Sequence, residues 1–207
     1  MKLRTKLPLT ITAIMLLVAA AGLFAIWTLN QTVGVYARVI AFDNANERMA
    51  GEIAVDFKTQ VQEWKNTLLR GKDPKAFEQH WTSFEKHEQT VSARTKELVE
   101  ALPDGEARSQ AEAFAQAHAR MGDDYRKGLA AFQAAGFDSS IGDIAVKGMD
   151  RAPSEMLVTL RGKISENSTA AVDAATQSGR RAILIGLSLM AVAVSYTHLT
   201  LPTIYSV

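Results

Sequence analysis

The stretch "PKAFEQHWTSFEKHEQTVSARTKELVEAL" (residues 74–102) carries the pattern that decides the fold. Its mostly apolar positions recur at alternating steps of four and three, the heptad spacing of a helix that packs along one face. The positions on this seam are Phe77, Trp81, Phe84, Glu88, Val91, Thr95, Leu98 and Leu102. Asp73 is a good N-cap and Pro74 a favoured first helical residue, so a helix is predicted to begin here.

The same spacing recurs on both sides of this helix. The seam of the preceding helix comprises Val33, Ala37, Ile40, Met49, Ile53, Phe57, Val61, Trp64 and Leu68, and that of the next comprises Ala107, Ala111, Phe114, His118, Met121, Tyr125, Leu129 and Phe132. Gly71 is predicted to end the helix before residue 74 in a left-handed C′ conformation, and Gly136 to end the helix that begins near Ala107 in the same way. Asp138 is predicted to cap the start of the fourth arm. "LPDGEA" (102–107) predicts a tight turn between the second and third helices.

The fourth arm is less regular at its start. Gly142, Gly148 and Pro153 interrupt it, and Pro153 is expected to kink a helix or begin a new one because proline lacks an N–H. Beyond it the seam returns at Leu157, Leu160, Ile164, Asn167, Ala171 and Ala174. No segment alternates with the period of two that marks a strand. The sequence therefore predicts an all-α fold, an antiparallel four-helix bundle with short turns.

An uncharged stretch precedes the bundle. Residues 1–6, "MKLRTK", carry three basic side chains, Lys2, Arg4 and Lys6, and residues 7–29 carry no charge. That length suits a first transmembrane helix, whereas a cleaved signal peptide, the alternative, has a shorter apolar region. The positive-inside rule makes residues 1–6 a cytoplasmic stub, with Trp27 at the far interface. Residues 30–181 are then expected in a bacterial periplasm, anchored to the inner membrane.

A second apolar segment, residues 182–193, is too short to cross a bilayer by itself. It is followed by "VSYTHLTLPTIYSV" (194–207), which could form an interfacial end with Tyr196 and His198 at the headgroups. These residues also resemble a translated transposon-type sequencing adapter, codon by codon. We therefore expect a truncated second transmembrane helix over 182–193 and a non-native tail over 194–207.

Composition excludes several functions. The 23 basic and 22 acidic residues form no block of one sign, so no nucleic-acid partner is expected. There is no cysteine, and the four histidines form no i, i+4 pair, so neither a thiol nucleophile nor a common metal site is indicated. A glycine-rich phosphate loop and a nucleophile elbow are also absent from the sequence, which predicts neither an enzyme nor a cofactor.

Three stretches carry a family resemblance: "VDFKTQVQEWKNTLLRGKDP" (55–74), "HWTSFEKHEQTV" (80–91) and "VKGMDRAPSEML" (146–157). Together with the two apolar segments, they resemble the N-terminal sensor region of bacterial methyl-accepting chemotaxis proteins over nearly all of residues 1–193. The resemblance implies a homodimer that binds a small-molecule ligand or a periplasmic binding protein. It also implies that a small helix displacement is relayed across the membrane to a cytoplasmic output module. Similar sensors precede diguanylate cyclases and histidine kinases, so the output stays open.

Six residues are candidates for a ligand site. Glu88 and His118 fall at the same level of neighbouring seams and could face each other as a pH-sensitive polar site, or lie at the seam edge as a solvated pair. Trp64 and Trp81 could form an aromatic wall for a ligand, or pack in the core. Arg151, beside Asp150 at an irregular helix start, could bind a carboxylate with two hydrogen bonds or pair locally.

Arg180 and Arg181 run against the positive-inside trend, because they precede the second apolar segment on its expected periplasmic side. An even number of membrane helices still requires this placement, since residues 1–6 and the chain beyond 193 then lie on the same side.

Overall fold

The structure, a computed structural model, describes the backbone of residues 3–205 and the side chains of residues 8–9 and 11–196. Every regular element in this range is helical, which confirms the all-α prediction. The elements are α1 (Leu3–Arg38), the π-helix η1 (Val39–Asp43), α2 (Asn44–Arg70), α3 (Pro74–Ala101), α4 (Glu106–Ala134), α5 (Ser139–Ala145) and α6 (Arg151–Tyr205). The chain divides into two compact units. We call residues 40–168 the bundle, and residues 1–39 with 169–207 the apolar helix pair.

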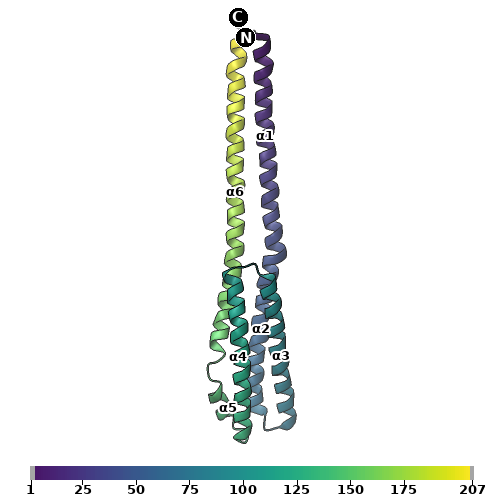
Figure 1. The fold of residues 1–207 in the computed structure, drawn as a ribbon, viewed down its shortest axis with the longest axis vertical. Helices are drawn as coiled ribbons and strands as arrows, with labels where there is room; N and C mark the ends of the chain where they lie inside the picture. The colour runs from purple at the N-terminus through teal and green to yellow at the C-terminus, as the bar shows by residue number, and fades with distance from the viewer. Residues whose placement is uncertain (1–2, 206–207) are drawn as a thin grey trace. The chain divides into compact units, whose positions relative to one another are not determined.

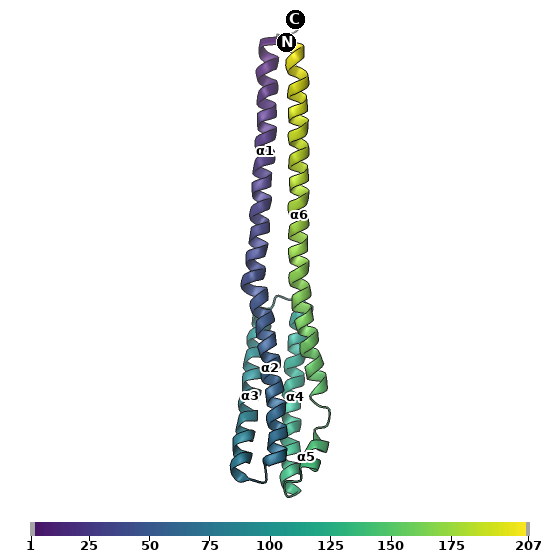
Figure 2. The same ribbon diagram turned by 180° about the vertical axis from the view of Figure 1, so that it is seen from behind.

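Four arms make up the bundle. Helices α2, α3 and α4 form three of them, and the short α5 together with residues 151–168 of α6 forms the fourth (Figures 1 and 2). Contacts join α2 to α3, α3 to α4, and α5 to both α4 and α2, so the arms close into a ring around one core. The predicted four-helix bundle is confirmed, with its last arm divided into two helices.

The central parts of the predicted seams point into this core, whereas the seam positions Val33, Ile40 and Asn167 are exposed. Among their positions, Ile53, Phe57, Trp64, Leu68, Phe84, Val91, Leu98, Phe114, Met121, Tyr125, Phe132, Leu157, Leu160 and Ile164 are buried. Most of these side chains are large and apolar, and burying one fully contributes about 1.5–3 kcal/mol. The heptad spacing therefore concentrates the buried apolar side chains along the axis of the bundle.

Two turns between arms carry side-chain caps, as the sequence predicts, whereas Gly105 before α4 makes none. Asp73 accepts hydrogen bonds from the backbone N–H groups of Lys75 (2.8 Å) and Ala76 (3.3 Å) at the start of α3. Asp138 accepts one from the N–H of Ser140 (2.9 Å) at the start of α5. Gly136 follows α4 with φ +66°, so its predicted left-handed conformation is confirmed.

The prediction for Gly71 is wrong. Its φ is −70°, in the right-handed helical region that any residue adopts. Glycine is instead required by close packing, because a Cβ atom here would lie 2.4 Å from the carbonyl oxygen of Thr67 and 3.0 Å from the ring of Phe132. The sequence marks the helix end correctly but not the reason for the glycine.

The interruption of the fourth arm is confirmed. Residues 146–150 form the turn between α5 and α6, and Gly148 there has φ +77°. Pro153 lies in the first turn of α6, where a missing N–H breaks no intrahelical hydrogen bond. Pro153 thus starts a helix rather than kinking one.

Helix α1 and the part of α6 from Thr169 onward form the apolar helix pair. Each contains a segment long and apolar enough to cross a membrane, within residues 11–70 and 151–196. Their register is fixed by a hydrogen bond between the hydroxyls of Tyr36 and Thr176 (2.9 Å), and by Thr32, whose Oγ1 would lie 3.6 Å from a Cβ at Gly179. Most of the large apolar side chains of the pair are exposed, among them Leu16, Leu23, Leu184 and Val192. Such surfaces suit a lipid environment.

The predicted boundaries within this pair stay predictions. The backbone of α6 is helical to Tyr205, which does not bear on whether residues 194–207 are native. The side chains of Lys2, Arg4, Lys6 and His198 lie outside the described ones.

Candidate functional site

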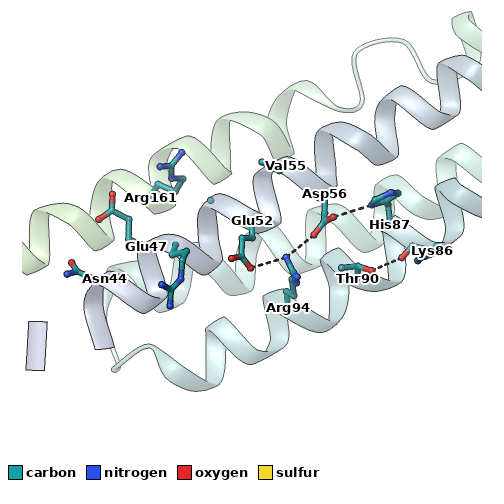
Figure 3. Close-up of a pocket in the computed structure, with 12 residues that line it drawn as sticks. Asn44, Glu47, Glu52, Val55, Asp56, Lys86, His87, Thr90, Arg94 and Arg161 are labelled. Carbon is teal, nitrogen blue, oxygen red and sulfur yellow. Dashed lines mark hydrogen bonds and ion pairs between the residues drawn. The ribbon is translucent and has the colours of Figure 1, made fainter. Parts of the chain in front are cut away.

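An open groove of about 820 Å³ runs along the bundle between α2 and α3, with Arg161 of α6 at its side (Figure 3). Its lining is mostly polar and charged: Asn44, Glu47, Arg48, Gly51, Glu52, Val55, Asp56, Lys86, His87, Thr90, Arg94 and Arg161. Three arms therefore contribute to one surface feature that could hold a polar ligand.

Arg94 organises the middle of the groove. Its Nη1 lies 3.1 Å from Oε2 of Glu52 and 3.0 Å from Oδ2 of Asp56, so one guanidinium of α3 binds two carboxylates of α2. The Nδ1–H of His87 donates to Oδ1 of Asp56 at 3.2 Å (Figure 3). This network connects α2 to α3. It does not include the other charged side chains that line the groove.

Several other charged side chains of the groove form no ion pair within the described structure. Among the described side chains, Glu47, Arg48 and Arg161 take part in no ion pair. The guanidinium of Arg161 lies over α2, because a Cβ at Gly51 would be 3.9 Å from its Cζ. The groove thus offers both signs of charge to a ligand, on α2 and on α6.

A second polar feature lies inside the bundle, centred on His118. This side chain is 2% exposed, and its Nε2–H donates to Oε1 of Gln60 at 2.8 Å. Its Nδ1 lies 3.4 Å from Oγ of Ser92, a hydroxyl that can donate to it. Burial lowers the pKa of His118, and the nearby charge of Glu88 opposes this only in part. Burial therefore favours the neutral form of His118.

Two donors of α2, one of them on the Gln60 that bonds to His118, lack partners. Within the described structure, the side-chain N–H₂ of Gln60 and the indole N–H of Trp64 are buried without a hydrogen bond. Both belong to α2, four residues apart, and so lie on the same face. Unsatisfied buried donors are destabilising, so each of these two groups lowers the stability of the bundle.

Glu88 does not bond to His118. Its carboxylate accepts two hydrogen bonds from the guanidinium of Arg126 on α4, at 2.9 and 2.5 Å. That hydrogen bonding raises the pKa of Arg126. The predicted facing pair is therefore replaced by two separate arrangements, a buried His118 bound to Gln60 and a partly exposed ion pair between α3 and α4.

Trp64 and Trp81 contact each other edge to face, with ring centroids 6.4 Å apart. Trp64 also meets Tyr125 at 5.1 Å, and Trp81 stacks on Phe84 at 4.8 Å. These contacts fit the core-packing interpretation of the two tryptophans, because each ring is covered by other rings of the bundle.

Asp150 and Arg151 lie at the start of α6 as predicted, but no ion pair joins them among the described side chains. Arg151 is exposed and lies against Gly148, its Nε 3.8 Å from a Cβ built there. The charge of Asp150 adds to burial in raising the pKa of Tyr125. Arg151 remains accessible to an anionic ligand.

A curated protein is similar in sequence to most of this chain. The sequence is 33% identical, over 174 residues and 84% of its length, to the methyl-accepting chemotaxis protein CtpH of Pseudomonas aeruginosa. The chain is a homologue of methyl-accepting chemotaxis proteins. The aligned region spans 30% of that receptor's length. No protein-family model and no solved structure matches the chain.

None of the six predicted site residues lines the groove of this chemoreceptor homologue. A signal for the groove is nevertheless present in the sequence. Polar residues recur at steps of four on both helices, as Asn44, Arg48, Glu52 and Asp56 on α2 and as Lys86, Thr90 and Arg94 on α3. Such rows mark one exposed helix face, and two facing rows can mark a polar groove.

Proposed function

We propose that the bundle is the ligand-sensing region of a transmembrane chemoreceptor. The observation that carries this proposal is the four-arm bundle in a chain with two candidate membrane spans, combined with homology to a methyl-accepting chemotaxis protein. The basic residues 1–6 support a periplasmic bundle above the bacterial inner membrane. Chemoreceptors transmit signals without catalysing a reaction, which agrees with the lack of enzyme motifs.

The groove is the part of the bundle where we expect a small polar ligand to act. A molecule that pairs with Arg161 on α6 and with Glu47 or Arg48 on α2 would connect two arms that the Arg94 network leaves unconnected. A ligand can move a helix only if it binds one position of that helix better than another. Contacts to both α2 and α6 meet this requirement, and a shift of about 1–2 Å is typical of such switches.

A homodimer and a cytoplasmic output module complete the proposed receptor. The output of a chemoreceptor would control a kinase, and the alternatives are a diguanylate cyclase or a histidine kinase. Docking of a periplasmic binding protein is the alternative to direct binding of a small molecule.

A hybrid receptor tests the proposal. Residues 1–193 would replace the homologous N-terminal region of a methyl-accepting chemotaxis protein, in bacteria that lack other chemoreceptors. Compounds would first be screened with the full chain in lipid nanodiscs, because a ligand of the native state raises the melting temperature. We expect at least one such compound to elicit swimming responses through the hybrid.

Matched variants locate the site. Arg161→Gln should abolish both the thermal shift and the response, whereas Arg120→Gln, at an exposed position of α4 outside the groove, should leave both intact. If no compound stabilises the chain but a periplasmic binding protein does, direct sensing is wrong. A hybrid that is stably inserted yet never changes kinase activity would contradict the receptor function itself.

A further inference from the structure

Two adjacent arginines stand at the edge of the apolar part of α6. Arg180 and Arg181 are exposed and directly precede residues 182–193, which carry no charge. On α1, the apolar stretch ends at Leu29 and is followed by the polar residues Asn30 and Gln31. The contacts of Tyr36 with Thr176 and of Thr32 with Gly179 place the ends of the two apolar stretches at a similar level. Both helices therefore change from apolar to polar where the arginines lie.

The protein supplies almost no countercharge there. Asp173 is the one carboxylate side chain in residues 1–39 and 169–207. It lies seven and eight residues before the arginines, or about 10–12 Å along the helix axis, too far for an ion pair. Neither arginine forms an ion pair with a described side chain.

The direction of the two side chains follows from helix geometry. Gly179 and Ala182 both face α1, since Gly179 lies near Thr32 and Ala182 is 4% exposed. Successive residues turn by about 100° around a helix, so Arg180 and Arg181 project to opposite sides of α6 and away from α1. Both guanidinium groups therefore point outward from the pair, toward whatever surrounds it.

We propose that Arg180 and Arg181 bind the phosphate groups of anionic phospholipids at the membrane boundary of α6. The guanidinium group binds phosphate through two parallel hydrogen bonds, and the aliphatic part of arginine can lie along apolar surface while its charge stays at the interface. Lipid phosphates supply the countercharge that the helix pair lacks. They also stabilise the pair of cations on the side where the positive-inside rule disfavours them. The proposal depends on membrane insertion of α6 and not on any sensory ligand.

Lipid retention by the full chain tests this site. The chain would be inserted into nanodiscs of phosphatidylcholine, alone or with a minority of phosphatidylglycerol, and the lipids that remain bound in native mass spectrometry would be counted. The pair Arg180→Gln/Arg181→Gln should weaken the preference for phosphatidylglycerol by about fivefold per arginine. The control pair Lys65→Gln/Arg120→Gln removes two exposed charges of the bundle and should leave the preference unchanged.

The melting temperature of the same samples gives a second readout. Phosphatidylglycerol should raise it for the native chain and for the control pair, less so at high salt, and not for the Arg180/Arg181 variant. Soluble glycerol phosphate should not replace the lipid. Equal lipid preference in all three proteins would overturn the proposal, and so would full replacement by glycerol phosphate. A chain that fails to insert into bilayers would overturn both this site and the proposed receptor function, whereas inserted chains without lipid preference overturn only the site.

Discussion

His118 lies at the centre of the bundle with both ring nitrogens near hydrogen-bonding partners and little access to water. Gln60 on α2 is uncharged, and Ser92 on α3 is a hydroxyl. Glu88 is the charged residue whose field acts on the ring, and Arg126 binds its carboxylate. A proton added to His118 would therefore gain little compensation for the loss of hydration.

The stability of the bundle should consequently depend on pH through His118. In the unfolded chain this residue titrates near 6.5, and in the folded chain burial lowers its pKa. Below pH 6.5 the unfolded state binds more protons, so the free energy of unfolding should fall as pH falls, until the folded pKa is passed. Above pH 6.5 the effect should vanish. Denaturation at pH 7.5, 6 and 5 measures it.

His118→Gln should remove this part of the pH dependence while keeping a donor for Gln60. His87→Gln, at the partly exposed groove, is the control that should retain it. If the native chain and His118→Gln lose the same stability between pH 7.5 and 5, neutral His118 has no role in the pH response.

Two helical glycines should respond oppositely to alanine. At Gly128 of α4, a Cβ would lie 2.6 Å from Cγ1 of Val146, so Gly128→Ala should destabilise the bundle by about 1–3 kcal/mol through overpacking. At Gly162 of α6, no atom lies within 4 Å of that position, so Gly162→Ala should stabilise by about 0.5–1 kcal/mol. Urea denaturation of both variants checks the signs. Similar stabilisation by both would show that α4 and the turn at Val146 pack less closely.

At the scale of whole elements, helix starts differ in how they are capped. The carboxylate of Asp73 accepts two backbone hydrogen bonds before α3, whereas Asp43 before α2 makes no side-chain cap and has helical φ and ψ of −71° and −42°. The second helix continues from η1, so its first N–H groups need no cap from a side chain.

Removing the two aspartates should therefore have unequal effects. Asp73→Ala should lower the free energy of unfolding by about 1 kcal/mol, as expected for the loss of an N-cap. Asp43→Ala should change it by only a few tenths of that amount. Thermal melts of the two variants make the comparison, and equal losses would mean that the charge near the helix, rather than the cap, matters.

The sequence predicts these elements well because periodicity and caps are local signals. The three long seams, the turns near Asp73 and Asp138, and the start of α6 near Pro153 all depend on neighbouring residues. The role of Gly71 is not predictable in this way because it depends on Phe132, about sixty residues away. The polar rows on α2 and α3 that line the groove are visible in the sequence, but which of their charges meet depends on contacts between helices. The partners of Glu88 and His118 depend on helix rotations that spacing alone leaves open.

At the scale of the whole molecule, the two candidate spans and the bundle require a definite topology. The native chain has no cysteine, so a single Lys72→Cys substitution at the exposed α2–α3 turn creates one reporter. A maleimide that cannot cross the inner membrane should label it in intact cells whose outer membrane is permeable. Labelling only after lysis would place the bundle in the cytoplasm and overturn the receptor topology.

The unpaired donors around His118 have a consequence for protein engineering. A pair of buried polar groups can be replaced together by apolar side chains of similar shape without loss, and here such a replacement also removes an orphaned amide. The double substitution Gln60→Met/His118→Phe should thus raise the melting temperature of the bundle. The polar layer that Gln60, Ser92 and His118 form between α2, α3 and α4 is therefore the first position to change in a more thermostable version of this bundle.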